Sequence, residues 1–372
     1  MKVNRGVLWR RLARTGVASA VAMTAAVLAV PAPAHAAAPY GSGFVWLDSE
    51  DASMCQVPAD HQWNSTSPWE PVNMVCEEDF GRYTVTLPGL GVAAGTVQVT
   101  AYGADAAYCK TQSWAPSGAD QRIVVRCFDN TGAAVESRFT LSYTNRSGTG
   151  YPLAYAFANQ PAAASYTPPV NYQFNSGGGS VTVTRADIGD YTASIPNLGG
   201  DGGHVQVTAY GPGSEWCTAF SWWRSGGTEL VRVKCFTAAG TPANAKFTMA
   251  YVRNGNILGD GVCCNSDGHP TAYTYGDGGF TGTYLPNPLY TFGFAPTGQI
   301  RRLERGRYEV DFNQSTDVGT IQVTPVGYGE WRCKLESWGT GTKAVVRCTD
   351  PATGAPKDGT YLFHYVGPFV VG

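Results

Sequence analysis

Hydrophobic and polar positions alternate in short runs along most of the chain. Four such runs in its first half, at residues 82–87, 96–102, 122–128 and 138–143, place β-branched and aromatic residues beside polar ones. This period of two predicts strands with one buried face. Pro and Gly between the runs predict turns, and no segment keeps a helical period over a useful length. We therefore expect an all-β fold of antiparallel β-sandwiches, immunoglobulin-like or jelly-roll.

This strand pattern occurs three times. The segment GTVQVTAYG at residues 95–103 recurs as GHVQVTAYG at 203–211 and, more loosely, as GTIQVTPVG at 319–327. Nine landmarks of the first copy recur in the second with a constant offset of 108 positions: Gly81, Tyr83, Val97, Tyr102, Cys109, Trp114, Cys127, Phe139 and Tyr143. The third copy repeats seven of them with small shifts: Gly306, Tyr308, Ile321, Cys333, Trp338, Cys348 and Tyr365. A gapless register of this length indicates duplication of a whole domain, because solenoid repeats are only about 20 to 50 residues long.

The copies predict the domain organisation. We expect β-sandwich repeats at residues 41–150, 151–256 and 271–372, with a Cys-containing linker at 257–270. Residues 1–36 have the basic start, short apolar core and Ala-His-Ala ending of a secretory signal peptide. The apolar core is shorter than the ~20 residues of a membrane helix. We expect export, cleavage after about Ala36 and release outside the cell, with twin-arginine export at Arg10 and Arg11 as the alternative route.

Composition is in keeping with an exported protein. Without residues 1–36 the chain keeps 21 Lys and Arg against 28 Asp and Glu, a net charge of about −7. This acidic balance argues against nucleic acid and against anionic membrane surfaces as partners. Charged residues make up only 15% of the chain, below the ~25% of ordinary globular domains. The sequence therefore predicts a neutral, polar surface rich in aromatic rings.

Ten cysteines in an exported chain favour disulfides over metal sites. The repeat suggests three pairs: Cys109 with Cys127, Cys217 with Cys235, and Cys333 with Cys348. Each would constrain the unfolded chain by about 3 kcal/mol. Zinc ligation lacks the required Cys and His spacing.

Four cysteines have no equivalent in the other copies. Cys55 and Cys76 flank an insertion in the first copy, and we expect them to pair. Cys263 and Cys264 are adjacent in the linker, where a vicinal disulfide would require unusual backbone geometry. Pairing elsewhere in the chain, or between two molecules, is the alternative.

The conserved tryptophans and basic residues of the copies have structural explanations. Trp114, Trp222 and Trp338 stand at the far end of a hairpin strand from its cysteine, where a large ring closes a core more often than it binds a ligand. The basic residue before the second cysteine of each pair falls on the opposite strand face, where a charge usually only solvates the surface. These residues are Arg126, Lys234 and Arg347.

No motif of a known catalytic centre is present in the sequence. The four histidines after the leader are His61, His204, His269 and His364, and none has a histidine at the equivalent position of another copy. Neither G-x-S-x-G nor H-E-x-x-H nor a P-loop occurs. The stretches 265–268 and 277–279 resemble parts of calcium loops but lack the full spacing. We predict no catalytic residue, no metal and no cofactor.

Aromatic residues outside the landmarks give the better functional indication. Flat rings among Asn, Gln, Ser and Thr are typical of surfaces that bind sugars or proteins. The candidate binding residues are Trp63, Trp69, Trp216, Trp223 and Trp331. The competing interpretation is that each copy needs aromatic residues for its own core.

The shared pattern G-x-Y-x-V, G-x-V-Q-V-T-A-Y-G, C-x-x-x-S-W and V-x-V-x-C-F resembles secreted tandem-repeat proteins of uncharacterised function from actinobacteria and related soil bacteria. The third copy departs from it at Thr349, which stands where the others have Phe. The resemblance implies an exported repeat protein and no particular activity. We hypothesise a secreted, non-enzymatic binding or structural protein for glycans or cell-envelope surfaces, in which linked weak sites gain avidity. A polysaccharide hydrolase and a protein-binding inhibitor or toxin-associated module are the alternatives, and oligomeric state stays open.

Overall fold

The computed structural model describes most of the chain after the predicted leader, and residues 35–372 group into one compact unit. The described residues are 40–49, 55–58, 61–145, 150–260, 268–277, 282–294, 298–312, 318–339 and 341–368. The predicted signal peptide and both Cys263 and Cys264 lie outside these ranges.

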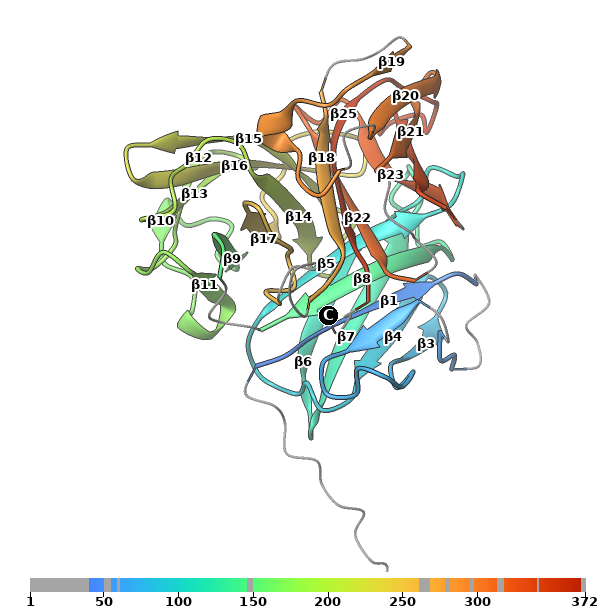
Figure 1. Ribbon diagram of the computed structural model, residues 1–372, viewed down its shortest axis with the longest axis horizontal. Helices are drawn as coiled ribbons and strands as arrows, with labels where there is room; N and C mark the ends of the chain where they lie inside the picture. Colours follow the sequence, from blue (N-terminus) through green and yellow to red (C-terminus); the bar gives the residue numbers. More distant parts are fainter. Residues whose placement is uncertain are drawn as a thin grey trace, which may run out of the picture. The chain divides into compact units, whose positions relative to one another are not determined.

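Strands dominate all three copies (Figure 1). The first copy contains β1 Ser42–Leu47, β2 Gln62–Asn64, β3 Met74–Asp79, β4 Arg82–Leu87, β5 Thr96–Tyr102, β6 Tyr108–Ser117, β7 Asp120–Phe128 and β8 Arg138–Thr144. The second contains β9 Leu153–Ala158, β10 Ser165–Tyr166, β11 Gln173–Asn175, β12 Thr182–Asp187, β13 Asp190–Ile195, β14 His204–Tyr210, β15 Trp216–Ser225, β16 Thr228–Phe236 and β17 Lys246–Val252, with the short 3-10 helix η1 Val170–Tyr172. The third contains β18 Thr271–Gly276, β19 Thr283–Tyr284, β20 Gln299–Glu304, β21 Arg307–Asp311, β22 Thr320–Val326, β23 Arg332–Trp338, β24 Lys343–Thr349 and β25 Thr360–Val366, with η2 Pro288–Tyr290.

The all-β prediction is confirmed. The four strands predicted in the first copy are β4, β5, β7 and β8, with ends that differ by at most two residues. The described part of the chain contains no α-helix. In β7 buried and more exposed residues alternate as predicted, whereas every residue of β5 is buried, because its polar side chains face the other copies.

Each of the three sheets takes its strands from two copies. One has the order β19-β20-β21-β24-β23-β5-β8-β1-β2, another β10-β12-β13-β16-β15-β22-β25-β18, and the third β11-β9-β17-β14-β6-β7-β4-β3. In the third sheet, strands β3, β4, β7 and β6 belong to the first copy, and β6 lies next to β14 of the second copy. In the same way β15 of the second copy lies next to β22 of the third, and β23 of the third lies next to β5 of the first. The copies form a closed cycle.

The joints between copies are parallel, so the sheets are mixed where the sequence predicts antiparallel ones. β6 pairs with β14, β15 with β22, and β23 with β5. At each joint the glycine that ends the shared nine-residue segment donates its N–H to the neighbouring copy. The three bonds are Gly211 N to Thr111 O (3.0 Å), Gly327 N to Ala219 O (3.1 Å) and Gly103 N to Leu335 O (3.0 Å). Figure 1 shows the three strands that carry these segments, β5, β14 and β22, gathered in the middle of the unit.

Each copy still has a core of its own between its two half-sheets. The first core is built from residues of the first copy, including Tyr83, Phe139 and Tyr143. The core of the second copy also takes in Val326 and Leu362 of the third. The core of the third takes in Trp46 and Tyr102 of the first. Neighbouring copies therefore share apolar burial as well as sheets.

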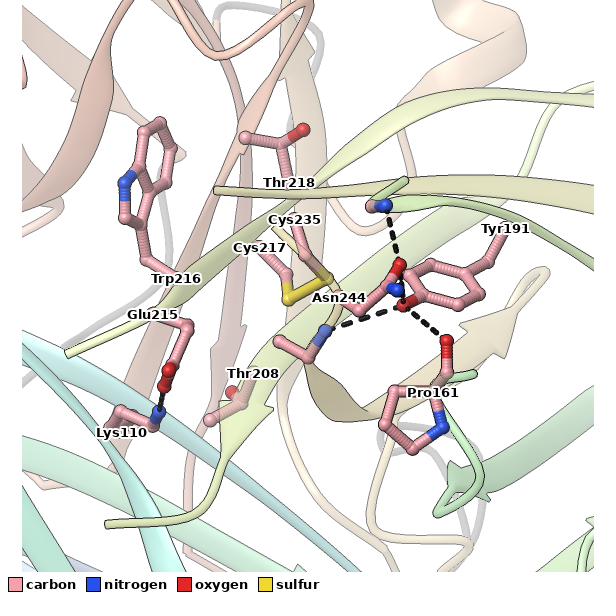
Figure 2. The surroundings of a disulfide bond; sticks show 12 residues. Lys110, Pro161, Tyr191, Thr208, Glu215, Trp216, Cys217, Thr218, Cys235 and Asn244 are labelled. Atoms are coloured by element: carbon pink, nitrogen blue, oxygen red, sulfur yellow. Dashed lines mark hydrogen bonds and ion pairs between the residues drawn. A yellow bond between two sulfur atoms is a disulfide. The ribbon is translucent and has the colours of Figure 1, made fainter. Parts of the chain in front are cut away.

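Four disulfides lie within the described residues. They join Cys55 to Cys76, Cys109 to Cys127, Cys217 to Cys235 and Cys333 to Cys348, all as the sequence predicts. The last three each join directly opposed residues of one hairpin. Figure 2 shows the bond in the second copy beside Tyr191, whose hydroxyl donates to Pro161 O at 3.0 Å. The bridge links β15 to β16 close to Ala219, where β15 pairs with β22 of the third copy.

Candidate functional site

The residues that all copies share are engaged in contacts between copies. The threonine of the Q-V-T sequence in each copy donates to the glutamine of the preceding copy in the cycle. The bonds are Thr208 Oγ1 to Gln98 Oε1 (2.9 Å), Thr324 Oγ1 to Gln206 Oε1 (2.6 Å) and Thr100 Oγ1 to Gln322 Oε1 (3.0 Å). All six side chains are buried. Since a buried polar group is costly unless it is hydrogen-bonded, this repeated pairing fixes the copies to one another. The strongest sequence repeat thus marks the assembly and is not available to a ligand.

The landmark tryptophans also lie at the joints. Trp114 packs against Phe157 of the second copy, with 4.8 Å between ring centroids. Trp222 packs against Tyr290 of the third copy at 5.3 Å, and Trp338 against Trp46 of the first at 4.8 Å. Trp114 and Trp338 are buried, which agrees with their interpretation as core residues, and Trp222 is half-buried. All three close the contact between two copies.

The predicted binding tryptophans do not form one surface. Trp63 and Trp216 are buried, and Trp331 is half-buried with its Nε1 donating to Thr360 O at 3.0 Å. Trp69 and Trp223 are the exposed ones, with 70% and 41% of their surface accessible. Trp69 lies in the insertion of the first copy. Trp223 lies on β15, next to the landmark Trp222.

Trp223 borders a cavity of about 200 Å³ at the joint between the second and third copies. Trp222, Tyr290 and Leu289 supply apolar walls, and Asp201, Arg224 and Glu229 supply polar ones. Gly202 allows the two copies to approach here, because a Cβ on it would lie 1.8 Å from Leu289 O, and its φ is +78°. The cavity therefore exists only where the third copy is docked.

Two charged side chains at the mouth of this cavity are held in place by each other. Arg224 Nε lies 3.0 Å from Asp201 Oδ1, and both side chains are more than half exposed. An exposed pair of this kind adds little stability. It does present fixed donors and an acceptor beside the free face of Trp223.

Glu229 supplies a buried acid to the same cavity. Its side chain is fully buried, Oε2 accepts from Gly200 N at 3.2 Å, and Oε1 has no hydrogen-bond partner among the described residues. Burial raises the pKa of Glu229 to about 7. In the first copy Gln121 stands at this position and accepts from Val92 N in the same way. Glu229 is therefore a titratable substitute for a neutral amide.

The substitution Glu229→Gln is expected to stabilise the protein at alkaline pH. Because the folded pKa lies above the ordinary 4.5, the carboxyl contributes no penalty at pH 4.5, and stability is lost as pH rises from there through 7. The variant should be more stable than the wild type by about 1–3 kcal/mol at pH 8 and similar to it at pH 4.5. Urea unfolding at both pH values measures this. A variant that is less stable at pH 8 would contradict the assignment.

We expected the shared basic residues only to be solvated on the surface. Two of them are instead ion-paired. Lys234 Nζ lies 2.9 Å from Asp190 Oδ2, and Arg347 Nε lies 2.6 Å from Glu336 Oε2. Hydrogen bonds from Arg232 and from Lys234 hold the pKa of Asp190 below its usual value. Arg126 lies over the ring of Phe128 at 5.7 Å. The three positions thus stabilise their own sheets.

Sequence reasoning did not single out Asp201, Arg224 or Glu229, because none recurs in all three copies. The signal that could have found Glu229 is its departure from Gln121 at the constant offset. Across the described ranges no helix is both long and apolar enough to cross a membrane, and no three His, Cys, Asp or Glu side chains cluster as metal ligands would. No family model, no curated protein and no solved structure matches this chain.

Proposed function

We propose that this protein is a secreted, non-catalytic binding protein whose ligand is a neutral glycan of a cell envelope, bound at the cavity beside Trp223. The observation that carries the proposal is the exposed indole of Trp223 next to the Arg224–Asp201 pair at the mouth of that cavity. A sugar offers one apolar ring face and a rim of hydroxyls. An indole face with fixed hydrogen-bonding groups beside it matches both.

Trp223 is special to one joint, which supports a role beyond packing. The equivalent positions hold Ala115 in the first copy and Gly339 in the third. The joints close without a ring there, so the second copy does not require one for its fold. An exposed tryptophan that the repeat does not demand is best explained by a contact outside the molecule.

Export is supported by chemistry as well as by the leader. Disulfides persist in oxidising compartments and are rare in the cytosol, and four are present in the described residues. We infer that the three copies are β-sandwich units, immunoglobulin-like or jelly-roll, which act as one rigid body. A rigid scaffold preserves the relative position of rings and polar groups, so less conformational entropy is lost on binding.

The substitution Trp223→Ala is expected to weaken glycan binding about 10- to 30-fold while leaving the fold intact. The variant reproduces Ala115 of the first copy, so its unfolding should match that of the wild type. A glycan array and isolated cell walls, probed with labelled protein, provide the measurement. Trp69→Ala removes an even more exposed ring elsewhere and should bind normally. Equal binding by both variants, or no binding by the wild type, would refute the proposal.

A glycan hydrolase is the second candidate, because Asp201 and Glu229 both line the cavity. A general acid works best with a pKa near the working pH, and that of Glu229 is about 7. Turnover of any glycan that the protein binds, abolished by both Glu229→Gln and Asp201→Asn, would favour this class over simple binding.

A further inference from the structure

The third copy places an arginine where the other two have aromatic rings. Arg332 opens β23, at the position of Tyr108 on β6 and Trp216 on β15. Its Cζ lies 4.0 Å from the centroid of the Tyr108 ring and 5.0 Å from that of Trp216. One residue from each copy therefore meets here, and the guanidinium group packs against two rings.

This guanidinium is buried and only partly hydrogen-bonded. Arg332 is 6% exposed. Its Nη2 donates to the carbonyl groups of Ala238 and Pro351, whereas Nε and Nη1 have no partner among the described residues. Burial lowers the pKa of Arg332 only to about 10, so the group is charged at neutral pH. A buried charge with free donors costs several kcal/mol unless it is compensated.

Arg332 lines a cavity of about 60 Å³ where the three copies meet. Lys110 and Lys334 also line it, and their side chains are only 1% and 8% exposed. Figure 2 shows Lys110 reaching from the first copy to Glu215, beside Trp216 and Thr208 of the cavity wall. Three buried cations thus surround one small space.

The carboxylates that neutralise these cations lie toward solvent. Glu215, 3.2 Å from Lys110 Nζ, is 37% exposed, and Asp105, 2.5 Å from Lys334 Nζ, is 51% exposed. Asp129 and Asp350 also act on Arg332 electrostatically, but both accept hydrogen bonds from the amides of their own turns. Solvent screens exposed charges far more than buried ones. The potential inside the cavity is therefore positive.

We propose that this cavity binds a small inorganic anion, chloride or a tetrahedral oxyanion, which pairs with Arg332 and joins the three copies. The space exceeds what a single water occupies and suits a small anion. Because the site draws residues from all three copies, its ligand would stabilise the closed cycle. This site is separate from the Trp223 cavity, and either can fail without the other.

Thermal and urea unfolding of the full chain tests the proposal. Sodium chloride or sodium sulfate is varied against sodium gluconate, so that ionic strength is constant and gluconate is too large to enter. For a dissociation constant of about 10 mM, raising chloride or sulfate from about 1 to about 100 mM should lower the unfolding equilibrium constant about tenfold. Arg332→Met should lose this response, whatever its own stability. Arg122→Met, which removes an exposed arginine of the first copy, should keep it.

A second measurement does not depend on variants. Crystals grown or soaked in bromide should show anomalous scattering from an ion within hydrogen-bond distance of Arg332. Chloride responding alone would identify a halide site, and sulfate responding as strongly would identify an oxyanion site; both support the proposal. Equal responses of wild type and Arg332→Met, or a cavity with water and no bromide, would overturn it.

Discussion

A chain that ends after residue 256, and so lacks the third copy, is expected not to fold into two stable copies. Removing that copy leaves β5 without β23 and β15 without β22. It also removes Val326 and Leu362 from the core of the second copy. Exposed strand edges and an opened core are large losses for a domain that is ordinarily stable by only ~5–15 kcal/mol. We expect loss of the near-ultraviolet circular dichroism signal and of the cooperative thermal transition.

A circular permutant gives the matched control. It begins at residue 151 and continues to 368. A copy of the segment 145–150 then joins residue 368 to residue 40, and the first copy follows. In the native chain this segment connects the first copy to the second. All three joints are preserved, so this permutant should fold with a cooperative transition. A truncated chain with a native spectrum and a sharp transition would show that the copies are independent domains.

In the Glu229→Gln background, stability is expected to fall steeply when the pH is lowered from 7 to 5, because two histidines are buried together. The rings of His204 and His364 lie 4.9 Å apart, and both side chains are at most 1% exposed. Burial lowers the pKa of His364 to about 3 and, with the proximity of His364, brings that of His204 well below 6.5. Tyr273 packs against both rings.

The sign of the effect follows from where the protons bind. Below pH 6.5 the unfolded chain protonates both histidines and the folded chain does not, so stability is present above that pH and is lost as the pH falls. Two such groups lower the free energy of unfolding by about 2–4 kcal/mol between pH 7 and pH 5. Carboxyls with a lowered pKa, such as Asp358 at about 2, contribute only below pH 4. Glu229, whose raised pKa of about 7 makes it add stability as the pH falls through the same interval, is removed by making the comparison in the Glu229→Gln background.

The other copies suggest the variant that tests this. Thr96 and Thr320 stand at the position of His204, and Ser142 and Ala250 at that of His364. Adding His204→Thr and His364→Ala to the Glu229→Gln variant should give a nearly flat stability between pH 7 and 5 in urea unfolding. The same slope as the Glu229→Gln variant would place the acid sensitivity elsewhere.

Local pattern was sufficient for the strands and the disulfides. Alternation depends on which face of a strand is buried, and neighbouring residues such as those of 122–128 show it directly. Cys109 and Cys127 pair because they oppose one another within a single hairpin. Both features follow from contacts close in sequence, so the sequence alone determined them.

Only the tertiary structure showed that the repeated residues hold the copies to one another. That Gln98 and Thr208 bond to each other depends on a parallel joint between strands more than 100 residues apart, and no local period encodes such a pairing. The sites argued above arise where the copies differ: Glu229 in place of Gln121, Arg332 in place of Tyr108 and Trp216, Trp223 in place of Ala115. The sequence displays these differences, but only the closed cycle brings each of them to a joint, because burial and charge at those positions are set by the neighbouring copy.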